Sequence, residues 1–173
     1  ARGGSVLAAT RCDSGALAEA DVRVVFVACG GSHTVALTSD GGVIVFGYNG
    51  QGQLGTGNNA RQPTPERLAC AALVGVRIVG CAAGAYFTHL VSDDGRVFAM
   101  GQNDNGQLGT GDTNAVNTPT EIDAAHFGGA PIAAVARGAG PRADGSLDLV
   151  LGAPGHEAGF GRSGSVYVLF GGS

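Results

Sequence analysis

The sequence is poor in charge and contains neither lysine nor tryptophan; only 14% of its 173 residues are charged. Its ten arginines are scattered and its net charge is −4, so it lacks the clustered positive charge of a nucleic-acid-binding face. Its longest apolar runs, such as residues 22–28, are far shorter than the roughly 20 residues that cross a bilayer. We therefore predict no nucleic-acid partner and no membrane span.

Recognisable catalytic patterns are also missing. The sequence shows no Ser/His/Asp order, no paired catalytic carboxylates and no phosphate-binding loop. The four histidines have no metal-ligand spacing, and the four cysteines form no Cys-x-x-Cys pair. We therefore expect a protein that is not an enzyme.

Glycine, by contrast, is abundant. The 32 glycines are about two to three times the usual share of ~7%. Only six prolines occur and glycine follows no Gly-X-Y period, which excludes collagen. Because hydrophobic residues reach 44%, the chain has enough apolar surface to fold. The composition thus predicts a turn-rich, all-β fold.

A tandem repeat explains many of these glycines. Residues 52–57 and 106–111 both read Gly-Gln-Leu-Gly-Thr-Gly, 54 residues apart. Within each unit, short β-branched runs alternate with Asp-Gly turns, and a Thr-Pro pair leads toward a fourth, edge-like strand. Three or four strands in a repeated unit of this length are typical of a propeller blade. The expected strands are 22–28, 34–38 and 43–46 in the first unit and 76–81, 88–91 and 97–100 in the second.

The motif of these units has a family likeness. Residues 30–37, 46–49 and 52–55 read Gly-Gly-Ser-His-Thr-Val-Ala-Leu, Phe-Gly-Tyr-Asn and Gly-Gln-Leu-Gly. Residues 22–125 thereby resemble the regulator-of-chromosome-condensation family of seven-bladed propellers. The family often has Trp where this chain has Phe46 and Met100. The resemblance implies a structural hydrogen bond for His33.

The C-terminal part follows another pattern. Residues 148–155 and 164–171 resemble an FG-GAP repeat, the blade type of integrin-α propellers, over about 127–173. A drifted blade of the first family is the alternative. FG-GAP blades often carry a calcium loop, and Asp144 and Asp148 match its end, whereas Gly140 and Arg142 replace two ligands. Asp144 and Asp148 are the metal candidates, with a plain β-turn as the alternative; we expect no other cofactor.

The predicted organisation is an incomplete or open propeller of about three four-stranded antiparallel blades. Residues 1–21 form an N-terminal segment or the end of a preceding blade. Blades 1, 2 and 3 are expected at 22–75, 76–126 and 127–173. A closed propeller needs at least four blades, so we expect either a fragment of a longer chain or a chain that completes its ring or stack with other copies or partners. Other protein chains, or copies of this one, are the expected partners that complete it.

The cysteines give a further expectation. Cys29 and Cys81 share strand parity, so they point to the same face of successive blades and should not pair. Buried thiols are the default expectation. Pairing of Cys70 with Cys81 or with Cys12 stays open if the protein is secreted.

The loop tips are the expected binding surface because function concentrates in exposed loops. The candidates there are Tyr48, Gln51, Gln102, Asp104, His156 and Arg162. We expect the repeated Gln53 and Gln107 to bond backbone, and Leu54 and Leu108 to pack between blades, because a repeated residue usually serves the repeated unit.

Three functions fit these features. The first is a non-enzymatic module of a secreted or surface-exposed protein that acts in adhesion or assembly, which places it outside the cell. The second is a nuclear or cytoplasmic regulator resembling a guanine-nucleotide exchange factor or chromatin-docking propeller, although no wedge loop or basic arm is visible. The third is an inhibitor of a secreted enzyme, anchored by Tyr48, Tyr86 and Phe160.

Overall fold

The computed structural model describes residues 21–127, 134–137, 149–153 and 165–169. These residues form an all-β structure of antiparallel strands, which confirms the predicted fold class. The strands are β1 (Val24–Cys29), β2 (His33–Thr38), β3 (Val43–Gly47), β4 (Gln62–Arg67), β5 (Ile78–Ala83), β6 (Phe87–Ser92), β7 (Val97–Gly101), β8 (Val116–Glu121), β9 (Ala134–Arg137), β10 (Leu149–Ala153) and β11 (Ser165–Leu169). Short 3₁₀ turns lie at Ala71–Leu73 and Ala124–Phe127.

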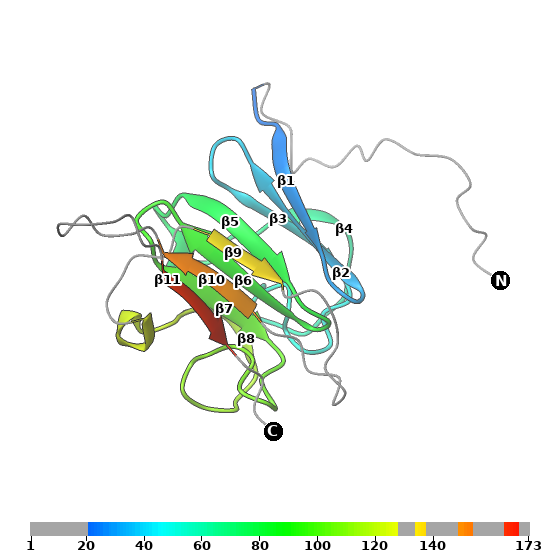
Figure 1. Ribbon diagram of the computed structural model, residues 1–173. Helices are drawn as coiled ribbons and strands as arrows, with labels where there is room; N and C mark the ends of the chain where they lie inside the picture. The colour runs from blue at the N-terminus through cyan, green and yellow to red at the C-terminus, as the bar shows by residue number, and fades with distance from the viewer. Residues whose placement is uncertain (1–20, 128–133, 138–148, 154–164, 170–173) are drawn as a thin grey trace.

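The strands form three sheets in which neighbours in sequence are neighbours in space. Blade 1 is the sheet β1-β2-β3-β4, blade 2 is β5-β6-β7-β8, and the third sheet is β9-β10-β11. Blade 2 lies between the other two, because β5 contacts β1 and β2 on one side and β9 on the other (Figure 1). Successive antiparallel sheets stacked in this way form a run of propeller blades. In the described residues the third sheet has three strands, where four were expected.

Strand boundaries agree best where an Asp-Gly turn sets them. The strands β2, β3, β6 and β7 lie within one residue of their predicted positions. The first strand of each blade begins two residues later than expected, and both contain a bulge, between Val24 and Phe26 and between Ile78 and Gly80. The Thr-Pro pairs lie inside β4 and β8, since an outer strand has a free edge that tolerates proline.

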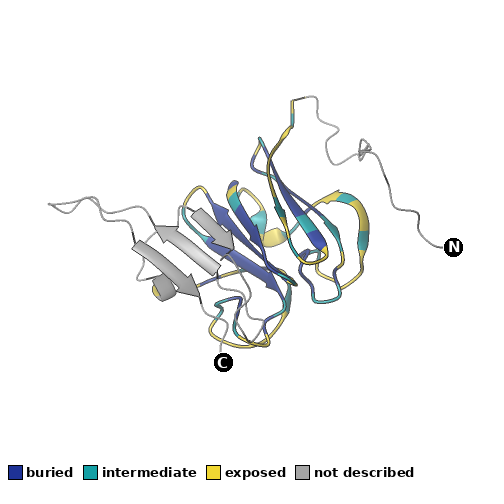
Figure 2. Cartoon of the chain, turned by 45° about the vertical axis from the view of Figure 1, so that its right-hand side comes forward, coloured by how far each residue is buried: buried dark blue, intermediate teal, exposed yellow. Residues whose placement is uncertain are grey.

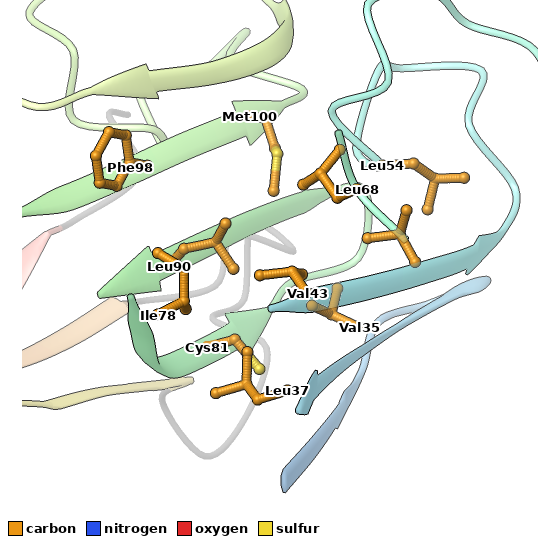
Figure 3. Close-up of a cluster of buried hydrophobic side chains, with 11 residues drawn as sticks. Val35, Leu37, Val43, Leu54, Leu68, Ile78, Cys81, Leu90, Phe98 and Met100 are labelled. Carbon is orange, nitrogen blue, oxygen red and sulfur yellow. The ribbon is translucent and has the colours of Figure 1, made fainter. Parts of the chain in front are cut away.

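The main core lies between blades 1 and 2 (Figure 3). Alternate residues of β2 and β3 point toward blade 2, as the two-residue period of a strand requires. Each fully buried aliphatic side chain contributes about 1.5–3 kcal/mol relative to exposure. The cluster consists of Val35, Leu37, Val43, Val45, Leu54 and Leu68 from blade 1 and its loops, and Ile78, Cys81, Leu90, Phe98 and Met100 from blade 2.

The cysteines are only partly as expected. Cys29, Cys70 and Cys81 are free thiols in this structure, so none of these three is bonded to another. Cys81 is buried, and desolvation raises the pKa of its thiol to about 12. Cys29 is exposed, so the expectation of a buried thiol is wrong there. Cys12 lies outside the described residues.

Exposure is uneven across the molecule. In Figure 2 the strands of blade 2 are mostly buried, whereas exposed residues follow the outer strand β4. The residues of β1 are also largely exposed, although the strand is apolar. Among the described residues, no helix is both long enough and apolar enough to cross a bilayer.

Candidate interaction surface at the blade junction

The loops that follow β3 and β7 share one backbone path. Gly55 and Gly109, at matching positions, have φ values of 71° and 73°. This left-handed conformation strains any residue with a Cβ. Gly55 is also crowded, because a Cβ there would overlap the Met100 side chain. The glycines of the repeat therefore fix both loops in the same shape.

A buried asparagine closes each loop. The Asn49 side chain accepts a hydrogen bond from the Leu54 backbone N at 2.9 Å and donates to the Asn58 carbonyl at 2.8 Å. Asn103 does the same with Leu108 N, at 2.9 Å, and with the Asp112 carbonyl, at 3.0 Å. Because an asparagine side chain both donates and accepts, one residue ties the two ends of the loop together.

The repeated Gln and Leu residues are structural, as predicted. The Gln53 side-chain oxygen accepts a hydrogen bond from the Gln51 backbone N at 3.0 Å, and Gln107 repeats this contact with Asn105 at 2.9 Å. Leu54 and Leu108 are fully buried. We call the buried Asn, Gln and Leu residues of these loops the loop frame.

The predicted interaction residues lie at the loop tips, outside the frame. Tyr48 is exposed and Gln51 is half-buried on the blade 1 loop. On the blade 2 loop, half-buried Gln102 donates to exposed Asp104 at 2.9 Å. The remaining candidates, His156 and Arg162, and the calcium candidates Asp144 and Asp148 lie outside the described residues.

Sequence reasoning missed part of the surface around Tyr48. A shallow depression of about 330 Å³ is lined by Ser32, Tyr48 and Arg61 of blade 1 and by Tyr86 of blade 2. The two tyrosine rings meet edge to face, with centroids 6.0 Å apart and planes at 67°. Ser32 and Arg61 were not predicted, and Tyr86 was considered only as an inhibitor anchor. The signal that could have found them is their failure to repeat, since Arg61 corresponds to Ala115 and Tyr86 to Ser32.

Buried polar contacts hold the two sides of this depression in place. Thr88 Oγ1 of blade 2 donates to the Gln53 carbonyl of blade 1 at 2.8 Å. It therefore accepts from His33 Nε2, which lies 2.9 Å away, and this arrangement assigns the proton to Nε2. The backbone N of Gly31 also donates to the Ala85 carbonyl at 3.1 Å. The structural hydrogen bond implied for His33 is thus confirmed.

Desolvation lowers the pKa of both buried histidines. Burial lowers the pKa of His33 to about 4 and that of His89, which contacts the Leu108 carbonyl at 3.2 Å, also to about 4. In both rings Nδ1 is buried without a hydrogen-bond partner. The histidines are therefore neutral structural groups near pH 7.

Metal chemistry has no support in the described part of the chain. Within residues 21–127 and the described strands after them, no three His, Cys, Asp or Glu side chains come together as a metal site. What the junction offers is a preformed, donor-rich surface.

The stacked four-stranded sheets and their repeated loop frame define a class of protein, the β-propellers built from a tandem blade motif. The chain belongs to the regulator of chromosome condensation (RCC1) repeat family. One model of this repeat matches residues 40–91 and 94–140, and a second matches 24–53 and 78–107. The predicted family is confirmed, whereas the FG-GAP likeness of the C-terminal part stays a prediction.

Similar proteins include large ligases and solved propellers. The chain is 38% identical over 101 residues to the human "Probable E3 ubiquitin-protein ligase HERC4", covering 58% of this chain and 9% of that protein. Human WBSCR16 is 28% identical with a TM-score of 0.64, covering 77% of this chain and 31% of that structure. Prp20p of Saccharomyces cerevisiae, described with its binding to Gsp1p and histones, is 26% identical with a TM-score of 0.59, covering 75% and 31%. The chain thus spans under a third of each.

Proposed function

We propose that this chain is a protein-interaction module of an intracellular regulator and performs no catalysis itself. Its likeness to Prp20p and to the HERC ligase supports the nuclear or cytoplasmic alternative over the secreted, adhesive module that we expected first. The ligase likeness covers only 9% of that protein, so it carries no argument for ligase activity here.

The observation that carries this proposal is the contrast between the loop frame and the loop tips. The frame residues are buried and identical in the two blades, as expected of groups that build the fold. The tips are exposed or half-buried and differ, with Tyr48 and Gly50 in blade 1 where blade 2 has Gln102 and Asp104. A rigid scaffold that carries variable, accessible tips suits selective binding. Tyrosine and arginine, both present at the junction, are enriched at binding hot spots.

Further blades are the second kind of partner that we propose. The apolar strand β1 is exposed, whereas its counterpart β5 is covered by β1, β2 and β9. An uncovered apolar strand favours association. Blades of the same polypeptide or of another chain would cover this side.

Tagging the endogenous full-length protein tests the proposal. We expect recovery in the nuclear or cytoplasmic fraction, and a set of proximity-labelled partners that is lost when Tyr48→Gln, Arg61→Ala and Tyr86→Ser are combined. Arg23→Ala, which removes another exposed arginine, should leave the set unchanged. Recovery at the cell surface or in the medium, or a partner set that survives the triple substitution, would contradict the proposal.

A further inference from the structure

Resting on the proposed function, we infer that the depression between the blades binds an acidic segment of a partner protein. A carboxylate of that segment pairs with Arg61, and a neighbouring apolar side chain lies against Tyr48 and Tyr86. The site is hereafter the tyrosine depression, formed by Ser32, Tyr48, Arg61 and Tyr86.

The polar groups of the depression favour an anion. Its described lining carries one guanidinium and three hydroxyl groups, and none of these four side chains carries a carboxylate. Ion pairs among the described residues use Arg67 and Arg96, and none of them uses Arg61. An exposed guanidinium presents a fork of N–H donors that matches a carboxylate. Charge complementarity therefore points to Asp or Glu as the group recognised.

The aromatic groups are held in position before any partner arrives. Tyr48 and Tyr86 are 43% and 39% exposed, so each keeps a large accessible face while supporting the other ring. The Tyr48 ring lies over Gly50, where a Cβ would overlap its hydroxyl group. Blade 2 has Asp104 at the position of Gly50, so its loop has no room for such a ring. A preorganised aromatic pair loses little conformational entropy on binding.

The blade fold does not require these side chains. The matching positions hold Gln102 for Tyr48, Ala115 for Arg61 and Ser32 for Tyr86, within loops of the same shape. Residues that a blade needs recur in both copies, as the frame residues do. The tyrosine depression is therefore an addition to the repeat, and its chemistry is specific to this junction.

A peptide selection tests the inference directly. The full 173-residue chain is immobilised and a phage-displayed random dodecapeptide library is selected against it. We expect the selected peptides to be enriched in Asp or Glu next to an aliphatic or aromatic residue. A synthetic copy in which Asn or Gln replaces each acid should bind at least about tenfold more weakly, since charge-assisted hydrogen bonds are the strong ones.

Substitutions that introduce the residue found at the matching position of the other blade show where the peptide binds. We expect the affinity for the selected peptide to fall about tenfold or more in each of Arg61→Ala, Tyr48→Gln and Tyr86→Ser, as it does when a hot-spot residue is removed. Arg61→Lys should retain part of the affinity, because the charge stays while the fork is lost. Arg23→Ala removes the same charge from another exposed position and should bind like the parent chain. Thermal melting of each variant checks that it is folded.

Several results would overturn the inference. The selection could yield no peptide, or peptides that are not enriched in Asp or Glu. The selected peptide could bind Arg61→Ala as tightly as it binds the parent chain, or Arg23→Ala could lose as much affinity as Arg61→Ala. If the cellular partner set still depends on the triple substitution while no acidic peptide is selected, the proposed function stands and this inference fails.

Discussion

The strands β1 and β5 occupy the same place in successive blades but differ in what covers them. Ile78 and Cys81 of β5 are 3% and 2% exposed, whereas their counterparts Val24 and Val27 in β1 are 43% and 50% exposed. Both strands are apolar, so composition does not explain the difference. The first strand of a blade is buried by the strands of the adjacent blades. β5 contacts strands on both sides, whereas within the described residues β1 contacts mainly β2 of its own sheet and β5 of blade 2. Stability in such repeats comes largely from the interfaces between units.

The largest predicted contrast follows from this pair of strands. Ile78→Ala should destabilise the chain by about 2–5 kcal/mol, because it leaves a cavity in the core between the blades. Val24→Ala, at the matching position of β1, should cost no more than about 1 kcal/mol, since its side chain is partly exposed already. Urea unfolding of both variants and the parent measures the two differences. Equal losses would mean that β1 is covered in solution.

The sequence predicts the architecture well because the same turn and strand motifs recur in each repeat. Asp-Gly turns and β-branched runs locate the inner strands, and the repeated Gln-Leu-Gly motif identifies the frame. The exposure of Cys29 was not predictable, because an apolar run indicates burial only when a neighbouring sheet is present. The bulges that displace the starts of β1 and β5 also leave no clear mark in composition.

The junction surface was only partly predictable. Tyr48 stands out as an aromatic residue at a loop tip. Its meeting with Tyr86 depends on how two blades stack, which one blade's pattern does not specify. Arg61 lies in the same depression although the chain makes a long loop between it and Tyr48. Comparing the two copies position by position, and asking where they differ, would have identified all of these side chains.

A smaller contrast concerns the polar contact that Thr88 makes between blades 1 and 2. Thr88→Val preserves shape but removes the hydroxyl that joins His33 to the Gln53 carbonyl. Leaving buried polar groups unpaired should cost about 1–3 kcal/mol. The matched change Thr34→Val, in blade 1 at the equivalent position and only half-buried, should cost less than about 0.5 kcal/mol. Guanidinium unfolding measures the free energy of unfolding of both variants. An equal loss would show that the Thr88 contact between the blades does not stabilise the chain.

A last contrast is a change in pH dependence, which we expect from the same histidine, His33. Burial lowers the pKa of His33 to about 4, whereas the unfolded chain has an ordinary histidine pKa near 6.5. Between these values the unfolded chain binds the proton and the folded chain does not, so stability falls as pH decreases from about 6.5 to about 4. Above about pH 7 the contribution is constant. The slope is at most about 1.4 kcal/mol per pH unit for each such histidine.

His33→Phe isolates this contribution because the second blade already holds Phe87 at the same position. Gly30 lies against the His33 ring as Gly84 lies against the Phe87 ring, so the glycine beside the ring is the same in both blades. The variant retains His89, whose pKa is lowered as well. Between pH 7 and pH 5 it should therefore lose about half as much stability as the parent, whatever its stability at pH 7. Thermal and urea unfolding at three pH values measure this, and an unchanged slope would place the pH dependence away from the junction between blades 1 and 2.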